Sequence, residues 1–260
     1  MRIEDLDAQR VRAADGVEAR QLADLHVLGL TWDGEVLRQS ERLDLYRDAV
    51  ASLPTYECYC TRREIAEAAS APHDDGHRPY PGTCRELSAA ERAARRAERP
   101  PALRVDARGA VVTVRDRWAG EVTGTVDDFV VRRNDGAHAY NLAVVVDDLE
   151  QGVTQVVRGD DLLASSPRQA WLARALGGTE PEYAHVGLVT NAVGARLAKR
   201  DGVVTLADLA AQGWTPARVL SVIGHSLGLC EADEPVDLDA LLARFDPALR
   251  PEVWVFPPAR

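Results

Sequence analysis

Lysine is almost absent from this chain of 260 residues. Of its 31 lysine and arginine residues only Lys199 is a lysine, and methionine occurs only once. Arginine serves as well as lysine on a solvated surface, because it carries the same charge. A site that needs a compact ammonium on a flexible stem is different, since a planar guanidinium cannot replace it. Lys199 is therefore either retained by chance or a functional residue.

Long hydrophobic runs and net positive charge are also lacking. No apolar run reaches the roughly 18 residues of a membrane span, and the N-terminus has no signal-peptide pattern. The formal net charge of −10 argues against broad attraction to nucleic acid and confines any RNA contact to a local basic surface. With 46% hydrophobic and 28% charged residues, the chain has the composition of a globular protein. We expect a cytoplasmic protein without membrane contact.

Cysteine is scarce, and three of the four cysteines lie close together in the sequence, at Cys58, Cys60 and Cys84. Disulfides are not expected in a reducing compartment, whereas three thiolates at this spacing suit zinc, which needs a fourth ligand. By position the candidates are His73, His77 and Tyr80, and imidazole is the commoner ligand. The alternative is a set of reduced, buried thiols.

The segment 55–100 around these cysteines is polar and has little apolar periodicity. It is predicted to be a small insertion without enough apolar surface for its own core, which metal–ligand bonds would organise. Cys230 lies apart from it in an apolar helical pattern and is interpreted as a core residue.

The hydrophobic pattern predicts a mixed α/β chain. The first residues resemble the end of a strand, and helices are expected at 16–30 and 40–53, the second beginning near Ser40. Strands are expected at 102–105, 110–116 and 127–133. The apolar run that begins at residue 139 is interpreted as a buried parallel strand, followed by a β-branched strand and a helix from Asp160. Another short strand covers 183–191, and helices with N-caps at Thr205 and Thr215 follow.

Three blocks of sequence carry a family resemblance. "RIEDLD", "DDFVVRRNDGAHAYNLAVVVDDLEQGVTQVVRGDDLL" and "RLAKRDG" resemble the catalytic core of class I glutamyl-tRNA synthetases. The short C-terminus and the C-x-C…Y-x-x-x-C pattern are most similar to the shortened glutamyl-Q tRNA(Asp) synthetase branch. The resemblance implies a Rossmann-type catalytic core with a zinc-binding insertion and a C-terminal helical region similar to a stem-contact region. The implied divisions are the rest of the first Rossmann half (1–54), the insertion (55–100), the second half (101–190), and the KMSKS-like loop with the helical region (191–260).

The resemblance also assigns residues to the site. It implies that zinc is held by Cys58, Cys60, Tyr80 and Cys84, and so selects Tyr80 over His77. The KMSKS-like loop is implied to bind ATP, with Mg²⁺, through Arg196, Leu197, Ala198, Lys199 and Arg200. Lys199 would follow the charge that develops on the leaving pyrophosphate, which a mobile ammonium can do. Ala198 departs from the usual serine, so one hydroxyl contact is missing while the charge is kept.

Three further residues are implied to bind L-glutamate. Arg158, just past the end of a strand, would contact a carboxylate of the substrate through its guanidinium fork. From residue chemistry alone, an ion pair with Asp160 or Asp161 is the alternative. Tyr140 would contribute a hydroxyl, or be an ordinary core aromatic. Glu4 would receive the substrate ammonium, or simply be solvated.

The implied function is the activation of L-glutamate with ATP, without tRNA, by a monomer. The glutamate is then transferred to the queuosine base at the first anticodon position of tRNA(Asp). One alternative is a truncated glutamyl-tRNA synthetase that charges the 3′ end of tRNA(Glu). Another is a noncatalytic, zinc-bearing remnant that binds RNA or a partner.

The HIGH motif of the family has no counterpart in this sequence. We expect that the true start lies upstream of Met1, by about forty residues on the length of one strand–helix–strand unit. The sequence then predicts that the 260-residue chain does not activate glutamate, and ATP–pyrophosphate exchange measures this. An in-frame HIGH motif upstream of Met1 would favour the enzyme.

Overall fold

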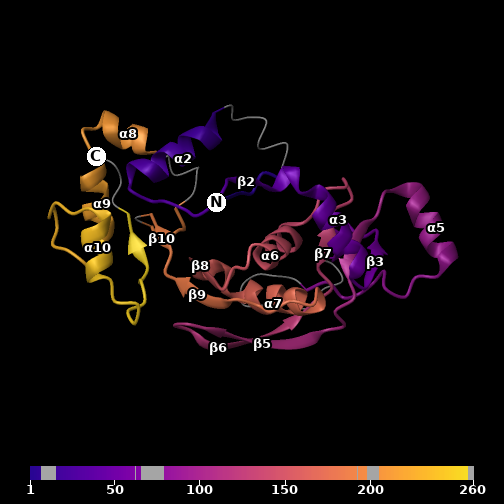
Figure 1. Cartoon of the computed structure of the whole chain (residues 1–260). Helices are drawn as coiled ribbons and strands as arrows, with labels where there is room; N and C mark the ends of the chain where they lie inside the picture. The colour runs from indigo at the N-terminus through magenta and orange to yellow at the C-terminus, as the bar shows by residue number, and fades with distance from the viewer. Residues whose placement is uncertain (7–15, 62, 66–78, 192, 198–204, 257–260) are drawn as a thin grey trace.

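The computed structural model describes residues 1–6, 16–61, 63–65, 79–191, 193–197 and 205–256 (Figure 1). Its larger sheet has four strands in the order β6-β5-β9-β8. These are β5 (Ala110–Asp116), β6 (Gly120–Val126), β8 (Gln155–Gly159) and β9 (Glu182–Val186). β9 is parallel to both β5 and β8, whereas β5 and β6 form an antiparallel hairpin. The parallel strands therefore end at one edge, where open α/β sheets bind ligands.

Helices α3 (Leu43–Ser52), α6 (Tyr140–Glu150) and α7 (Ser166–Ala175) form the layer that packs on this sheet. α7 contacts β5 and β6, α6 packs against α7, and α3 packs against α6 (Figure 1). A 3₁₀ helix, η2 (Asp160–Ser165), leads from β8 into α7. The main hydrophobic core lies between these layers and includes Leu142, Leu172 and Val105.

The strand predicted at the apolar run from residue 139 is wrong, because this run forms α6. Leu142, Ala143, Val144, Val145 and Val146 are all buried in this helix. A helix covered on most sides loses the polar stripe that would reveal its period, so its sequence resembles a buried strand. The β-branched strand that follows is confirmed as β8, and the helix expected from Asp160 is confirmed as η2 and α7.

The N-terminal segment begins with β1 (Arg2–Ile3), which pairs in parallel with β2 (Leu37–Arg38). The helices predicted there are confirmed as α2 (Val17–Val27) and α3. The helix start predicted near Ser40 is wrong: Ser40 lies in a 3₁₀ turn, η1 (Gln39–Glu41), and Arg42 is the N-cap of α3. The Ser40 hydroxyl donates to Asp5 Oδ2 at 2.6 Å, so it ties down the segment after β1 instead of capping a helix.

A smaller antiparallel sheet of β3 (Thr55–Cys58), β4 (Ala102–Val105) and β7 (Val130–Arg132) carries the cysteine-rich segment. α5 (Ala89–Glu98) projects from it at the opposite end of the molecule from the C-terminal helices (Figure 1). This segment has a small core of its own, contrary to expectation. Three tyrosines and two cysteines form it, namely Tyr56, Cys58, Tyr59, Tyr80 and Cys84.

The C-terminal region holds α8 (Leu206–Ala211), α9 (Pro216–Ser226) and α10 (Leu238–Arg244). The predicted N-caps are confirmed, because Thr205 accepts from the backbone N–H of Asp208 and Thr215 from that of Arg218. β10 (Val189–Thr190) pairs with β11 (Trp254–Val255). Cys230 is half-buried in a bend after α9, where its thiol lies 3.4 Å from the carbonyl oxygen of Ser221.

Among the described residues, no helix has the length and apolar character needed to cross a membrane.

Candidate active site and metal centre

Arg158 lies at the carboxyl end of β8, directly beside His185 at the end of β9. Its Nε donates to His185 Nε2 at 2.9 Å, and its Nη1 donates to Gln169 Oε1 at 2.7 Å. Its Nη2 donates both to the carbonyl oxygen of Leu162 at 3.2 Å and to Ser166 Oγ at 2.9 Å. Four of the five guanidinium N–H groups are thus used, and one on Nη1 is left without a partner among the described residues.

The surroundings of Arg158 are electrically unusual, because all four of its acceptors are neutral. The ion pair with Asp160 or Asp161 is not formed: Asp160 pairs with Arg250 at 3.0 Å, and Asp161 with Arg196. Burial lowers the pKa of Arg158, although nearby acidic groups act in the opposite direction. The described part of the chain therefore leaves a half-buried positive charge without a carboxylate in contact, which is the charge that an anionic ligand would neutralise.

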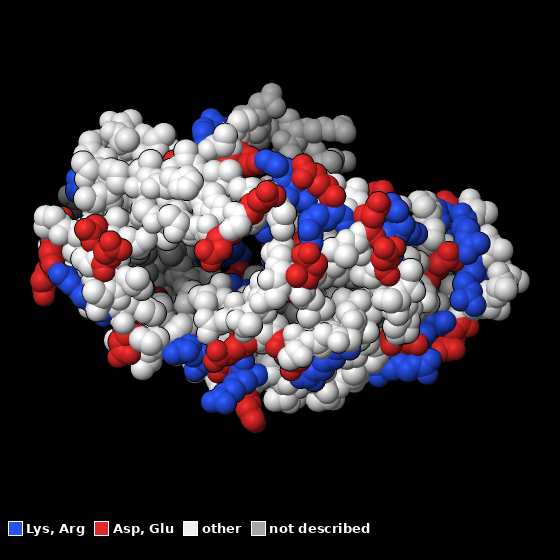
Figure 2. Space-filling model, in the orientation of Figure 1, with Lys and Arg blue, Asp and Glu red and all other residues white. Residues whose placement is uncertain are grey.

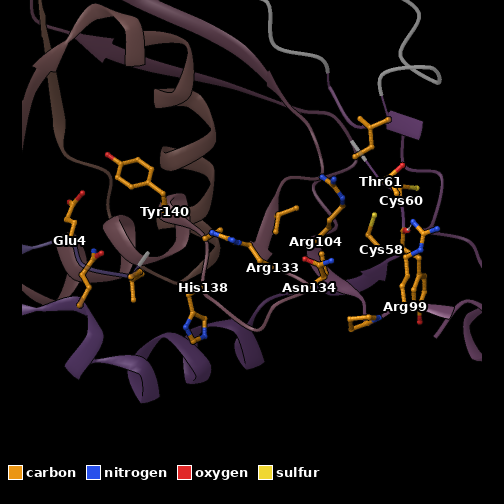
Figure 3. A pocket seen from close by; sticks show the side chains of 18 residues that line it. Glu4, Cys58, Cys60, Thr61, Arg99, Arg104, Arg133, Asn134, His138 and Tyr140 are labelled. Atoms are coloured by element: carbon orange, nitrogen blue, oxygen red, sulfur yellow. Dashed lines mark hydrogen bonds between the residues drawn. The ribbon is translucent and has the colours of Figure 1, made fainter. Parts of the chain in front are cut away.

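Tyr140 and Glu4 lie near each other at one end of a cavity of about 890 Å³ (Figure 3). Tyr140 is the first residue of α6 and remains 47% exposed, so it is not a core aromatic. Burial of its hydroxyl and the charge of Glu4 raise the pKa of Tyr140, while Arg158 and Arg2 lower it. These charged groups therefore surround the tyrosine hydroxyl.

Glu4 follows β1 and is held by Arg2, whose Nη2 donates to Glu4 Oε1 at 3.1 Å. Arg2 also bridges to α6, since its Nη1 donates to Asp148 Oδ1 at 2.7 Å. The carboxylate of Glu4 is thus oriented toward the cavity end, although it is exposed. The structure brings Glu4 and Tyr140 to this cavity, whereas Arg158 is not among its lining residues.

The other end of the same cavity is lined by Cys58 and Cys60, with Arg104, Arg133 and Asn134 between the two ends (Figure 3). The Sγ atoms of Cys58, Cys60 and Cys84 all lie within 4.8 Å of one another. Sulfur atoms around one tetrahedral zinc ion, with bonds of about 2.3 Å, lie about 3.8 Å apart. The three cysteines therefore fit a metal ion.

The hydroxyl of Tyr80 completes this group, at 3.4 Å from Cys58 Sγ and 3.5 Å from Cys60 Sγ. A sulfur and an oxygen bound to one tetrahedral zinc ion lie about 3.5 Å apart. The Tyr80 ring is fixed by Arg104, whose guanidinium carbon lies 3.8 Å from the ring centre. Burial raises the pKa of the Cys60 thiol to about 12, which disfavours an isolated thiolate. His73 and His77 lie outside the described residues.

Two aspartates anchor this segment to the rest of the protein. Asp128, which is buried, accepts from Tyr56 at 2.6 Å and from Arg85 Nε at 2.9 Å. Asp127 accepts from the backbone N–H of Tyr80 at 3.2 Å and from Arg168 of α7 at 2.8 Å. The cysteine-rich segment is therefore held in register with α7 by charge-assisted hydrogen bonds.

The KMSKS-like loop is described only at its start. The backbone N–H of Leu197 donates to the carbonyl oxygen of Val189 at 3.0 Å, so β10 positions the first residues of the loop. Arg196 forms its ion pair with Asp161, next to Arg158. Ala198, Lys199 and Arg200 lie outside the described residues.

Several residues of the site were not found from the sequence. His185 of β9 and the two α7 residues Gln169 and Ser166 contact Arg158, and none of them lies in a motif. Arg104 resembles any strand arginine in the sequence, and its burial beside Tyr80 follows only from the pairing of β3 with β4.

Comparison with known proteins shows the family of the chain. Residues 1–233 match the family described as "tRNA synthetases class I (E and Q), catalytic domain". The "Glutamyl-Q tRNA(Asp) synthetase" of Nocardia farcinica is 55% identical over 98% of this chain and 81% of that protein. The chain belongs to the glutamyl-Q tRNA(Asp) synthetase family. A protein of the same name from Deinococcus radiodurans is 48% identical over 87% of this chain and 77% of its own length.

The fold of this family member agrees with a solved structure. The glutamate tRNA ligase of Elizabethkingia meningosepticum superimposes with a TM-score of 0.75 over 98% of this chain and 59% of the ligase. At 24% sequence identity this likeness concerns the fold alone. The chain thus has the class I catalytic α/β fold, with a cysteine triad that could hold a metal and helices at its C-terminal end.

Proposed function

We propose that the chain acts in the activation of L-glutamate with ATP, without tRNA, and in the transfer of glutamate to the queuosine base of tRNA(Asp). The observation that carries this proposal is the 55% identity with the Nocardia farcinica protein over nearly the whole chain. Queuosine is the base at the first anticodon position, and it would receive the glutamate. An enzyme of this kind must bind an acidic amino acid, a nucleotide and an RNA loop.

The glutamate site is proposed at Arg158, Tyr140 and Glu4. Arg158 offers a charge that none of its neutral partners neutralises, together with one N–H that no described residue uses. A substrate carboxylate would therefore be bound through a single charge-assisted hydrogen bond and the guanidinium charge, instead of through both arms of the fork. Tyr140 would donate its hydroxyl, and Glu4, held by Arg2, would receive the substrate ammonium.

The nucleotide site is proposed along the loop from Arg196 to Arg200, with Mg²⁺ accompanying ATP. Arg196 stands beside the proposed glutamate site through its ion pair with Asp161. Lys199 would supply the mobile ammonium that stabilises charge on the leaving pyrophosphate.

The metal is proposed to be one zinc ion held by Cys58, Cys60, Cys84 and Tyr80. Three thiolates and a phenol oxygen form a closed tetrahedral set without an open position, so the ion has a structural role. It would supply the bonds that hold residues 58–60 against 80–84.

RNA contact is proposed on the side of the cysteine-rich segment. The face shown in Figure 2 has interspersed acidic and basic side chains, with basic groups gathered over α5 at the right-hand end. Such a local basic surface is what a chain with net charge −10 needs in order to bind phosphates.

The proposal is tested by glutamate transfer from chemically prepared glutamyl-adenylate, which separates acceptor choice from the ATP step. We expect labelled glutamate on tRNA(Asp) that carries queuosine, and none on tRNA(Asp) that carries guanosine at the same position. The two RNAs differ in one base, so they are matched controls. Transfer to the 3′ end of tRNA(Glu) would instead show an ordinary glutamyl-tRNA synthetase. No transfer to any RNA, with intact adenylate, would support the noncatalytic alternative.

A further inference from the structure

Arg158 is the end of a hydrogen-bonded chain that begins at a fully buried carboxylate. Asp116, at the end of β5, is 1% exposed and lies 2.7 Å from Nδ1 of His185. His185, also 1% exposed, has its other ring nitrogen 2.9 Å from Nε of Arg158. The proposed mechanism makes no use of His185 or Asp116.

The chemistry of the side chains determines which atoms carry the hydrogens in this series of hydrogen bonds. Nε of Arg158 always carries a hydrogen, so Nε2 of His185 must be the acceptor. The hydrogen of the neutral imidazole is then on Nδ1 and points to Asp116 Oδ2. If His185 were protonated, its Nε2–H would face the N–H of Arg158, and two positive charges would lie side by side. Burial lowers the pKa of His185, which agrees with a neutral ring.

Asp116 is itself held rigidly. Its Oδ1 accepts from the backbone N–H groups of Trp118 at 3.0 Å and Ala119 at 2.8 Å. Its Oδ2 also accepts from the backbone N–H of His185 at 3.1 Å. The carboxylate therefore fixes the orientation of the ring and keeps its own charge one side chain away from Arg158.

On its other side Arg158 is tied to the helix that carries Tyr140. Gln169 accepts from Arg158 through Oε1, and its Nε2 donates to Asn141 Oδ1 at 3.1 Å. Asn141 is the neighbour of Tyr140 at the start of α6. Among the described residues, the guanidinium is thus held between β9 and α7 by neutral groups, and Gln169 links it to α6.

We propose that His185 is a positioning residue, which acts as a neutral acceptor and holds Arg158 without neutralising it, so that the guanidinium charge is kept for a carboxylate of the substrate. A carboxylate in the place of His185 would hold the guanidinium as firmly, but it would compete with the substrate for the same charge. This inference rests on the proposed glutamate site, and it adds to it the residues that set the orientation and availability of its cation.

Two amide substitutions separate the roles of the two ring nitrogens. In His185→Gln the amide reaches the place of Nε2 and keeps an acceptor for Arg158. In His185→Asn the amide replaces Nδ1 and keeps a donor for Asp116, but it leaves Nε of Arg158 without its acceptor. Calorimetric titration with L-glutamate, in the absence of tRNA, is expected to show a dissociation constant about tenfold weaker for H185N, because a hydrogen bond to a charged group is lost. H185Q is expected to stay within about threefold of the unsubstituted protein.

The outcomes distinguish this inference from the proposed function. Equal weakening in both variants would show a merely structural role and overturn the inference, as would unchanged binding in H185N. If the unsubstituted protein shows no saturable binding of L-glutamate, the proposed glutamate site is overturned and the inference with it.

A second measurement needs no substitution and so does not depend on how the variants fold. Nitrogen-15 NMR of the histidine side chains reports which ring nitrogen carries the hydrogen. We expect His185 to be neutral at pH 7, with its hydrogen on Nδ1. A hydrogen on Nε2, or a doubly protonated ring, would overturn the inference.

Discussion

At the scale of single residues, two half-buried arginines of this protein differ in what they contact. Arg42 is paired directly with a carboxylate, since its Nε lies 2.9 Å from Oδ1 of the buried Asp147. Arg158 is also half-buried, but within the described part of the chain it contacts only neutral acceptors. The first arrangement stabilises the contact between α3 and α6, whereas the second would keep the proposed charge available for a ligand.

Replacing Arg158 tests this distinction. We expect Arg158→Gln to weaken L-glutamate binding by about 10- to 100-fold, because a charge-assisted hydrogen bond contributes about 1.5–3 kcal/mol. Equilibrium titration with L-glutamate measures the change. Arg174→Gln is the matched control, since Arg174 forms an exposed ion pair with Glu180, and such a pair contributes little. Equal affinities for the two variants would contradict the assigned role of Arg158.

Whether the sequence reveals that two side chains lie together depends on how many residues separate them in the chain. Cys58, Cys60 and Cys84 could be grouped from their spacing because metal ligands of one insertion lie close together in the chain, whereas only the family resemblance selected Tyr80 over His77. His185 and Asp116 are separated by 69 positions and meet only because β9 pairs with β5. No local pattern contains that information.

At the scale of secondary structure, strands with a clear period and helices that begin at a threonine N-cap could be predicted from the sequence. Helix α6 could not. Burial of α6 on most sides removes the polar positions that reveal a helical period. β6 was missed for a different reason, because its sequence GEVTGTV contains two glycines and few apolar residues. It is a strand because its partner β5 pairs with it along its whole length.

The cysteine-rich segment is predicted to bind zinc. We expect about one zinc ion per purified chain, and much less in Cys84→Ser, because a closed site needs all four ligands. Cys230→Ser is the matched control, since Cys230 lies outside the cluster and should leave the zinc content unchanged. Elemental analysis measures the content. Faster hydrogen exchange at residues 58–60 and 80–84 after chelation would show that the ion organises the segment.

The prediction that zinc holds the cysteine-rich segment together can be contradicted by measuring the zinc content and the hydrogen exchange. If freshly purified protein contains no zinc and chelator leaves hydrogen exchange in both stretches unchanged, the cysteines are reduced, buried thiols. The small core around Tyr56 and Tyr59 would then suffice to hold the segment together.

The junction of β10 and β11 depends on a glycine. A Cβ atom at Gly187 would lie 2.3 Å from backbone atoms of both Glu252 and Val253, which cannot move independently. We expect Gly187→Ala to lower the free energy of unfolding by about 1–3 kcal/mol, as overpacking does. It should also speed hydrogen exchange at Trp254 and Phe256, whose N–H groups donate to Leu188 and Thr190.

A second glycine serves as the control for that substitution. Gly136 has open space around it but a φ of +87°, so Gly136→Ala introduces backbone strain without a clash. Hydrogen exchange at Trp254 and Phe256 should remain unchanged in this variant. Unaltered exchange at these two amides in Gly187→Ala would show that the C-terminal strand does not depend on the close approach.

At the scale of the whole molecule, one cavity extends from the N-terminal segment and the start of α6 to the cysteine-rich segment. The four-stranded sheet carries Arg158 at its carboxyl edge, and the cysteine-rich segment closes the far end of the cavity. Family membership was predictable from the sequence because its motifs are long and contiguous. The joining of Glu4 and Tyr140 with Cys58 and Cys60 in a single cavity was not, since it depends on how α6 and β3 are placed (Figure 3).

The central claim is that Arg158, in its neutral surroundings, is the charge that binds the amino acid. A crystal structure of the chain with L-glutamate tests this most directly. We predict a glutamate carboxylate oxygen within hydrogen-bond distance of Nη1 of Arg158, with the substrate ammonium at Glu4 and the bond to His185 intact. Glutamate bound elsewhere, with Arg158 keeping its four neutral partners and no anion, would contradict the claim.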